Sequence, residues 1–252
     1  MFTVTPVRAF ADNYIWVLRQ DTGALAVDPG DAAPLIAYLQ HNRLALQGIL
    51  LTHHHADHTG GIAELLRLWP QATVYGPAGI PGVNEPVMDG SRFHWKGAQF
   101  EVMAVPGHTL DHLAYLAEGK LFCGDTLFGA GCGRVFEGTP AMMRDSLAKI
   151  AALPDTTRFF PAHEYTLSNL RFALAVEPDN EEILLRQTVD QKQRAMELPT
   201  LPTELGLEKT TNPFLRCHVD SVKKSAEAKA GHALADETEV FTVLREWKNH
   251  FA

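Results

Sequence analysis

The segment Thr52–His58 constrains this chain more than any other part of its sequence. It reads Thr-His-His-His-Ala-Asp-His and holds four of the 12 histidines. The apolar run Gly48–Leu51 comes directly before it, and Gly60-Gly61 lead from it into a stretch with helical spacing of apolar residues. Folding alone does not require such a cluster. Because imidazole and carboxylate groups are the ligands of zinc-like ions in catalytic sites, we predict a metal site at the end of a buried strand.

The spacing inside this segment predicts two directions for its side chains. His53 and His55 are two positions apart, so in an extended chain they point the same way. Asp57 and His58 follow where the chain must turn, so they can point elsewhere. We interpret this as two adjacent metal sites rather than one. His54 would point away from its neighbours, and we expect it to have a supporting or packing role.

Three further candidate ligands follow apolar strands downstream, at Pro106-Gly107-His108-Thr109, Cys123-Gly124-Asp125-Thr126 and Pro161-Ala162-His163-Glu164. The carboxyl ends of strands are where α/β folds place their sites. A single histidine of this kind is more often a surface or packed residue, so the prediction depends on their joint occurrence. The seven candidate metal ligands are His53, His55, Asp57, His58, His108, Asp125 and His163.

Glycine is frequent before residue 140, where short apolar strands alternate with helices, and rare afterwards. Strands are predicted over Tyr14–Leu18, Leu25–Val27, Gly48–Leu51, Ala72–Tyr75, Phe100–Val105, Leu113–Leu116, Leu121–Cys123 and Arg158–Phe160. Helices are predicted over Pro34–His41, Ile62–Trp69, Ala141–Leu153, Leu167–Val176, Glu181–Leu198, Asp220–Ala230 and Glu237–His250, with little periodicity in Pro199–Pro213. We therefore expect an α/β domain over residues 1–165 and a smaller helical domain over residues 166–252.

The composition excludes several classes of protein. The formal net charge of -8 argues against a nucleic-acid partner, which usually requires a basic face. No apolar run reaches the roughly 18 residues of a transmembrane helix, and the N-terminus lacks the pattern of a secretory signal. Three cysteines do not make a disulfide framework. We expect a cytoplasmic, monomeric protein without a membrane or nucleic-acid partner.

Several motifs resemble those of the metallo-β-lactamase superfamily, and more closely those of the glyoxalase II or hydroxyacylglutathione hydrolase family. The His-x-His-x-Asp-His pattern is typical of the superfamily alone, whereas Gly131-Cys132-Gly133-Arg134 and Asn212-Pro213-Phe214-Leu215-Arg216 are typical of the family. The resemblance covers nearly the whole chain. Its other motifs are Asp28-Pro29-Gly30, Thr52–Gly61, Pro106–Thr109, Phe122–Phe128 and Ala162–Thr166.

The resemblance implies a four-layer αβ/βα sandwich, an α/β fold, followed by an all-helical domain that helps to bind glutathione. It implies one metal ion on His53, His55 and His108, and a second on Asp57, His58 and His163, with Asp125 bridging. Two divalent ions per chain are expected, with zinc as the first choice and iron or manganese as alternatives.

The implied reaction is the hydrolysis of S-(2-hydroxyacyl)glutathione thioesters, typically S-D-lactoylglutathione, to glutathione and D-lactate. This is the second step of methylglyoxal detoxification. A hydroxide shared by the two metals would attack the thioester carbonyl, with Asp57, His58 and Asp125 as catalytic residues. The thiolate leaving group, whose conjugate acid has a pKa of about 8.5 by analogy with cysteine, needs little help from a general acid.

By the same resemblance, Arg134, Tyr165 and Arg216 contact glutathione. Phe136 stands where some members have a tyrosine, so one hydrogen bond to the substrate would be missing. Arg245 and Lys248 would extend this basic patch, or else face solvent as an ordinary helix surface. Replacing Arg216 by alanine is expected mainly to raise KM.

Three alternatives remain. A glutathione persulfide dioxygenase, a single-iron oxidoreductase, would not need the second set of ligands. A lactonase or an RNA-processing nuclease of the superfamily fits the acidic charge and the glutathione-type tail less well. A purely structural metal site would usually be closed and rich in cysteine.

Overall fold

The computed structural model describes residues 1–251 and divides into two compact units. Unit 1 comprises Met1–Ala104, Asp111–Gly124 and Phe160–His163. Unit 2 comprises Val105–Leu110, Asp125–Phe159 and the chain from Glu164 onward. The predicted ligands Asp125 and His108 therefore belong to unit 2, and the other five belong to unit 1.

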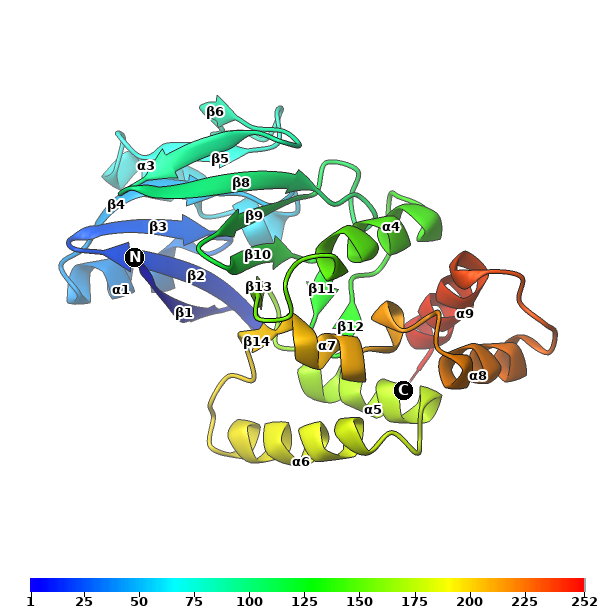
Figure 1. The fold of residues 1–252 in the computed structure, drawn as a ribbon. Coiled ribbons are helices and arrows are strands. Elements are labelled where there is room, and N and C mark those ends of the chain that lie inside the picture. Colours follow the sequence, from blue (N-terminus) through cyan, green and yellow to red (C-terminus); the bar gives the residue numbers. More distant parts are fainter. Residues whose placement is uncertain (252) are drawn as a thin grey trace. The chain divides into compact units, whose positions relative to one another are not determined.

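The first sheet of unit 1 has the strand order β1-β2-β3-β4-β5-β6 (Figure 1). Its strands β1 to β3 are antiparallel and β3 to β6 are parallel. A parallel connection needs a crossover, and helices α1 (Ala32–His41) and α3 (Ile62–Leu68) supply it between β3 and β4 and between β4 and β5. The six strands are β1 (Thr3–Ala9), β2 (Asn13–Gln20), β3 (Gly23–Val27), β4 (Ala45–Leu50), β5 (Thr73–Gly76) and β6 (Glu85–Pro86).

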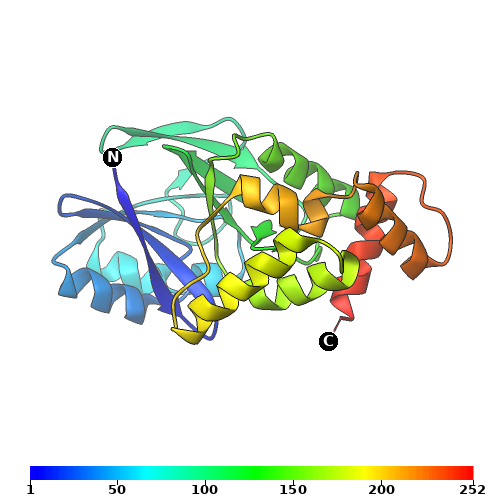
Figure 2. The same ribbon diagram turned by 60° about the horizontal axis from the view of Figure 1, so that its bottom comes forward.

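Helices α1 and α3 cover one face of this sheet, where they lie side by side (Figure 2). Leu35 and Leu39 of α1 and Leu65 of α3 join Ile49 and Val74 of the sheet in one buried cluster. The helical spacing of these leucines places them all on the face that meets the sheet. This packing holds the carboxyl end of β4, which the histidine-rich segment follows, and the carboxyl end of β3, which Asp28 follows.

The second sheet has the strand order β13-β10-β9-β8-β7 in unit 1. Glu118 and Gly119 form a two-residue turn between β9 and β10, with φ angles of 48° and 70°. Such turns join antiparallel strands tightly and favour glycine at the second position. The strands are β7 (Arg92–Trp95), β8 (Ala98–Ala104), β9 (Leu113–Ala117), β10 (Lys120–Gly124) and β13 (Arg158–Pro161). In unit 2, the first residues of β13 pair with β14 (Thr203–Glu204).

The two sheets of unit 1 pack face to face through aromatic side chains. The Trp16 and Phe160 rings meet edge to face at 5.1 Å, and the Tyr75 and Phe93 rings stack at 4.0 Å. The hydroxyl of Tyr115 donates to the carbonyl oxygen of Leu51 over 2.7 Å. One helical layer and two sheets of the expected sandwich thus lie within this unit.

Unit 2 is mainly helical and contains one short hairpin. Thr139, Asn180 and Asp236 cap α4, α6 and α9 by accepting hydrogen bonds from backbone N–H groups, as such residues commonly do. Its helices are α4 (Pro140–Ala151), α5 (Thr166–Val176), α6 (Glu181–Ala195), α7 (Leu205–Thr211), α8 (Asp220–Ala230) and α9 (Glu237–Asn249). The hairpin pairs β11 (Leu127–Phe128) with β12 (Gly131–Cys132).

The structure has a strand or a helix at each predicted range, and it also contains elements that were not predicted, namely β6, β7, β11, β12 and the short helix α2 (Ala56–Thr59). Further differences concern β1, the stretch Pro199–Pro213 and the end of α6. Strand β1 was not predicted, because Pro6 lowers the strand signal of an edge strand. The stretch Pro199–Pro213 is not aperiodic, since it contains β14 and α7. Helix α6 ends at Ala195 rather than Leu198. No helix within residues 1–251 is long and apolar enough to span a bilayer.

Candidate metal centre

The histidine-rich segment leaves β4 as extended chain and then turns into α2 (Ala56–Thr59). His53 and His55 point the same way, with Nε2 of His53 lying 3.0 Å from Nδ1 of His55. Asp57 and His58 lie in the short helix that follows. The ring of His58 lies 4.1 Å from the ring of His53, so these side chains are close together within unit 1.

Asp57, His58 and His163 form a compact group of ligand atoms. Oδ2 of Asp57 lies 3.5 Å from Nε2 of His58 and 3.5 Å from Nε2 of His163. Two donor atoms on a tetrahedral zinc ion, with bonds of about 2.1 Å, lie about 3.4 Å apart. The chemistry and spacing of these three side chains therefore fit a divalent metal ion.

The electrostatics of this group favour an ionised carboxylate. Hydrogen bonds with His163 and then His58 hold the pKa of Asp57 far below its usual range, and Asn13 contributes through its Nδ2, 3.1 Å from Oδ2. Burial acts in the opposite direction but is outweighed. A carboxylate that stays ionised can act as a metal ligand over the whole neutral pH range.

Two acidic side chains orient the histidines of this group. Oδ2 of Asp28 lies 3.0 Å from Nδ1 of His58, and Oδ1 of Asp12 lies 2.8 Å from Nδ1 of His163. Each carboxylate thereby directs the Nε2 atom of its histidine toward Asp57. Such carboxylate–histidine pairs fix the ring orientation of metal ligands. Asp12 lies in a turn without a motif, and Asp28 is recognisable in the sequence only as part of a family motif, so neither role was predicted.

Close backbone packing brings α2 to its position. A Cβ atom at Gly30 would lie 1.8 Å from the carbonyl oxygen of Asp57, so only glycine allows this approach. Thr52 adds a second anchor, because its N–H and hydroxyl both donate to the Asp28 carboxylate, over 2.8 and 2.7 Å. The Asp28-Pro29-Gly30 turn thus supports the ligand-bearing segment.

The two remaining candidate ligands form a pair within unit 2. Nε2 of His108 lies 3.4 Å from Oδ2 of Asp125, and both residues are buried. Nδ1 of His108 lies 2.8 Å from the carbonyl oxygen of Arg134. Because a carbonyl oxygen only accepts, Nδ1 carries the proton, and the lone pair of Nε2 is available to a metal ion.

Two further histidines, His54 and His112, lie near the candidate ligands. Nδ1 of His54 lies 3.0 Å from Oδ2 of Asp111 at the surface. The His112 ring is buried and stacks on the His53 ring at 4.6 Å, and its Nδ1 lies 3.1 Å from the Leu113 carbonyl oxygen. His112 therefore packs directly against a candidate ligand.

Basic side chains gather in unit 2 around Lys248. Burial and, after it, the positive charges of Arg245, Arg171 and Arg134 together lower the pKa of Lys248 to about 8. The Arg245 guanidinium donates to the Cys132 carbonyl oxygen over 2.9 Å. Arg171 was missed by sequence analysis, because it lies in α5 without any motif. Lys248 and these three arginines are called the cationic cluster below.

Two aromatic residues predicted to bind substrate are also in unit 2. Phe136 is exposed, and its ring lies 5.2 Å from the ring of His108. Tyr165 is exposed as well and meets the Phe128 ring edge to face at 5.2 Å. Both therefore present ring surface to solvent, and Phe136 does so next to a candidate metal ligand.

Arg216 has partners that differ from the predicted glutathione contact. Its Nε and Nη2 donate to both carboxylate oxygens of Glu177, over 2.8 and 2.9 Å, and its Nη1 donates to the Lys209 carbonyl oxygen. Ser221 also donates to Glu177. Burial raises the pKa of Glu177, but the Arg216 and Ser221 hydrogen bonds outweigh it and lower the pKa overall. The Arg216 guanidinium is thus engaged in a bidentate ion pair.

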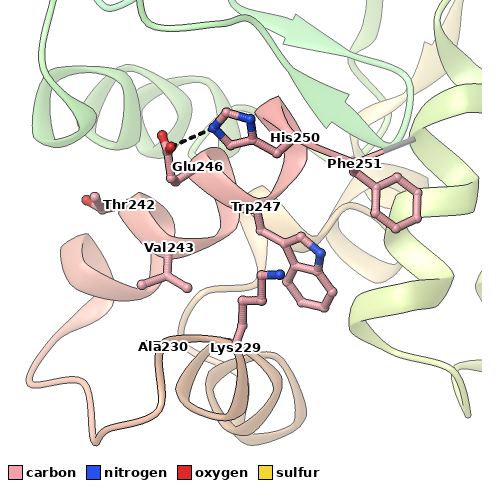
Figure 3. A pocket seen from close by; sticks show the side chains of 8 residues that line it. All are labelled: Lys229, Ala230, Thr242, Val243, Glu246, Trp247, His250 and Phe251. Carbon is pink, nitrogen blue, oxygen red and sulfur yellow. Dashed lines mark hydrogen bonds and ion pairs between the residues drawn. The ribbon is translucent and has the colours of Figure 1, made fainter.

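A separate hollow of about 470 Å³ opens between α8 and α9 (Figure 3). Lys229 lies over the Trp247 ring, 5.3 Å from its centre, and Glu246 pairs with His250 over 2.9 Å. None of the seven candidate ligands lines this hollow. It is therefore distinct from the metal-ligand groups.

Both parts of the chain match known protein families. Residues 10–163 match the family described as the metallo-beta-lactamase superfamily, and residues 164–251 match the hydroxyacylglutathione hydrolase C-terminus. The solved structure of ETHE1 from Myxococcus xanthus has a TM-score of 0.66 and 23% identity, covering 97% of this chain and 89% of that one. TTHA1623 in a di-iron-bound form has a TM-score of 0.62 and 26% identity, covering 84% of this chain and 100% of that one. The fold is therefore that of the metallo-β-lactamase superfamily.

Curated relatives specify the family within that superfamily. The hydroxyacylglutathione hydrolases of Aeromonas salmonicida and Vibrio parahaemolyticus are 53% and 50% identical over 254 residues, with full coverage of both chains. That of Nitrosomonas europaea is 47% identical, covering all of this chain and 97% of its own. The chain belongs to the hydroxyacylglutathione hydrolase family. The oxidoreductase and lactonase alternatives are accordingly not favoured.

Proposed function

We propose that this protein hydrolyses S-(2-hydroxyacyl)glutathione thioesters, with S-D-lactoylglutathione as the typical substrate, releasing glutathione and D-lactate. The observation that carries this proposal is the full-length match, at 50–53% sequence identity, to proteins named hydroxyacylglutathione hydrolase. The match includes the helical C-terminal part, which would serve glutathione recognition. A domain boundary at residue 165 is part of the proposal.

The proposed metal centre holds two divalent ions. His53, His55 and His108 would bind one, Asp57, His58 and His163 would bind the other, and Asp125 would bridge them. Support comes from separations of 3.4 and 3.5 Å between donor atoms within each unit, and from a structural neighbour described as di-iron-bound. Zinc is our first choice, with iron or manganese as alternatives. When bound, such ions supply a hydroxide near neutral pH and polarise a carbonyl group.

The connectivity of the chain supports including Asp125 and His108, the two candidate ligands in unit 2, in the proposed metal centre. Asp125 directly follows Gly124, the last residue of β10 in unit 1, so their Cα atoms are about 3.8 Å apart. His108 lies in the six-residue segment Val105–Leu110, which unit 1 residues flank at both ends. Along the sequence, both candidate ligands are therefore within three positions of a unit 1 residue.

The chain's own residues supply charge and orientation for the reaction. The ionised Asp57 carboxylate offsets positive charge, together with Asp125. Asp28 and Asp12 orient His58 and His163, as described above. The departing glutathione thiolate is stable enough at neutral pH to leave with little assistance. The proposed centre therefore needs no general acid to protonate the leaving group.

The cationic cluster is our proposed site for glutathione recognition. Glutathione carries two carboxylates and one ammonium group, so it requires local positive charge on an otherwise acidic protein. Burial first and then repulsion from the arginines lower the pKa of Lys248, and an anionic ligand would offset that repulsion. Tyr165 and Phe136 would add ring contacts beside it. We assign Arg216 instead to its ion pair with Glu177.

The deciding experiment measures release of free thiol from S-D-lactoylglutathione by metal-replete protein and by the same protein treated with a chelator. We expect rapid release that the chelator abolishes and added zinc restores. Absence of release by protein with two bound metal ions would contradict the proposed reaction. Monomeric state and cytoplasmic location, also proposed, are checked by light scattering after size-exclusion chromatography and by cell fractionation.

A further inference from the structure

The turn of the β11–β12 hairpin is buried in unit 2 and has an unusual backbone at Ala130. Ala130 is fully buried and has a φ of 54°, in the left-handed region that alanine seldom adopts. Its N–H donates to Oε2 of Glu208 over 2.8 Å. Since this conformation is intrinsically disfavoured, contacts from outside the turn must maintain it.

Two asparagine side chains hold the carbonyl groups of the same turn. Nδ2 of Asn169 donates to the Gly129 carbonyl oxygen, and Nδ2 of Asn212 donates to the Gly131 carbonyl oxygen, each over 3.0 Å. A Cβ atom at Gly131 would lie 2.4 Å from Asn169. The turn is thus closely enclosed by side chains from α5 and from the end of α7.

Glu208 is the charged member of this enclosure. It is fully buried, and its Oε1 lies 2.6 Å from Nη2 of Arg186 while its Oε2 accepts from Asn212 over 3.0 Å. Arg186 is buried as well. An ion pair removed from water is expensive unless its geometry is good and its other hydrogen bonds are satisfied. Here one carboxylate oxygen accepts from the turn, which links the ion pair to the hairpin.

The hairpin in turn sets the positions of two candidate metal ligands. It connects Asp125 to Arg134, and Arg134 provides the carbonyl oxygen that orients His108. Gly133 lies so close to Asp125 that a Cβ atom would be 2.0 Å from the Asp125 carbonyl oxygen. Gly133 N–H also donates to the Thr126 carbonyl oxygen over 3.2 Å. A shift of the turn would therefore move both Asp125 and the group that orients His108.

We propose that Glu208 is a positioning residue for the metal centre. Its carboxylate anchors the Ala130 N–H, which keeps the hairpin in the conformation that aligns Asp125 with the Nε2 atom of His108. This inference rests on the proposed metal centre. Glu208 does not contact either ligand, so its effect would pass entirely through the hairpin backbone.

The test compares Glu208→Ala with Glu208→Gln. The glutamine side chain keeps an oxygen that can accept from Ala130, whereas alanine keeps none. We expect Glu208→Ala to weaken binding of at least one zinc ion by about 10- to 100-fold, the range typical of lost outer-shell support, and Glu208→Gln to retain most of the affinity. Zinc affinity is measured by competition with a chromophoric chelator, below the melting temperature of each variant.

Val222→Ala is the matched control, because Val222 is fully buried in α8 and makes no part of the proposed site. It should lower the melting temperature without changing zinc affinity. In Glu208→Ala at limiting zinc, kcat should fall while KM stays within about twofold. If Glu208→Ala does not fold, Glu208→Asp, which keeps the charge but withdraws from Ala130, is measured in the same way.

Unchanged zinc affinity in folded Glu208→Ala would overturn the positioning role. An equal loss of affinity in Glu208→Gln would also overturn it, because the acceptor at Ala130 would then be irrelevant. Native protein that binds no zinc, iron or manganese would instead contradict the metal centre itself. The two failures are therefore distinguishable.

Discussion

Oδ2 of Asp28 lies 3.0 Å from Nδ1 of His58, and both side chains are almost completely shielded from solvent. Asp28 also accepts two hydrogen bonds from Thr52, so its carboxylate is held in place independently of the histidine. It therefore determines which nitrogen of His58 faces Asp57. The orientation of a candidate ligand thus depends on a residue from a different loop.

Removing this carboxylate should weaken metal binding. We expect Asp28→Ala to reduce zinc affinity by about 10- to 100-fold, because an unsupported histidine ligand is less basic and less well oriented. Chelator competition measures the change. Asp31→Ala is the control in the same loop, since Asp31 caps α1, and its loss should cost about 1 kcal/mol of stability without altering affinity. Equal affinities of Asp28→Ala and the native protein would contradict this role.

Replacing a proposed ligand should eliminate turnover while leaving the fold intact. Asp57→Ala or His58→Ala removes a donor atom from the group around His163, so hydrolysis of S-D-lactoylglutathione should fall to background. Circular dichroism should remain native-like. His54→Ala, in the same segment but paired with Asp111 at the surface, should retain activity. Full activity of Asp57→Ala would rule out its place in the centre.

The cationic cluster predicts a pH dependence of substrate binding. Lys248 loses its proton as the pH rises through about 8, so kcat/KM should fall over that range through a rise in KM. Lys248→Met should have a high KM that no longer shows this step. Lys192→Met, an exposed lysine on α6, should behave as the native protein. A step that persists in Lys248→Met would assign the titration to another group.

Lys248 should also make the stability of the fold depend on pH, but here the stability should increase with pH whereas kcat/KM should fall. Because its folded-state pKa of about 8 lies below the usual 10.5, the unfolded chain binds more protons between these values. Stability conferred through this group therefore increases as the pH rises from about 8 toward 10.5. Lys248→Met should flatten that part of the curve of melting temperature against pH. An unaltered curve would contradict the assignment.

Arg216→Ala should reduce stability rather than substrate affinity. It leaves the buried Glu177 carboxylate without its bidentate partner, which typically costs about 3–5 kcal/mol of unfolding free energy. Denaturant titration measures this loss. Because the Glu177 pKa is lowered in the folded state, the stability it contributes is present above the usual pKa of 4.5 and is lost as the pH falls through the folded-state value. A raised KM with undiminished stability would restore the glutathione-contact role.

The sequence by itself determined the elements that depend on neighbours along the chain. The limits of α8 are as predicted, because helical periodicity ends at the left-handed Gly231. The candidate ligands follow strands because a strand that ends in a polar turn presents its side chains at one edge of the sheet. Both signals are local, so they are visible before folding.

Tertiary structure alone decided which distant groups serve those ligands. Asp12 orients His163 across 151 positions of sequence, and nothing in its turn indicates this. Helix α7 was missed because its buried face carries Glu208, whose charge hides the apolar periodicity until Arg186 and Ala130 meet it. A buried polar group is stable only once its partners are in place, and those partners come from segments that only folding brings together.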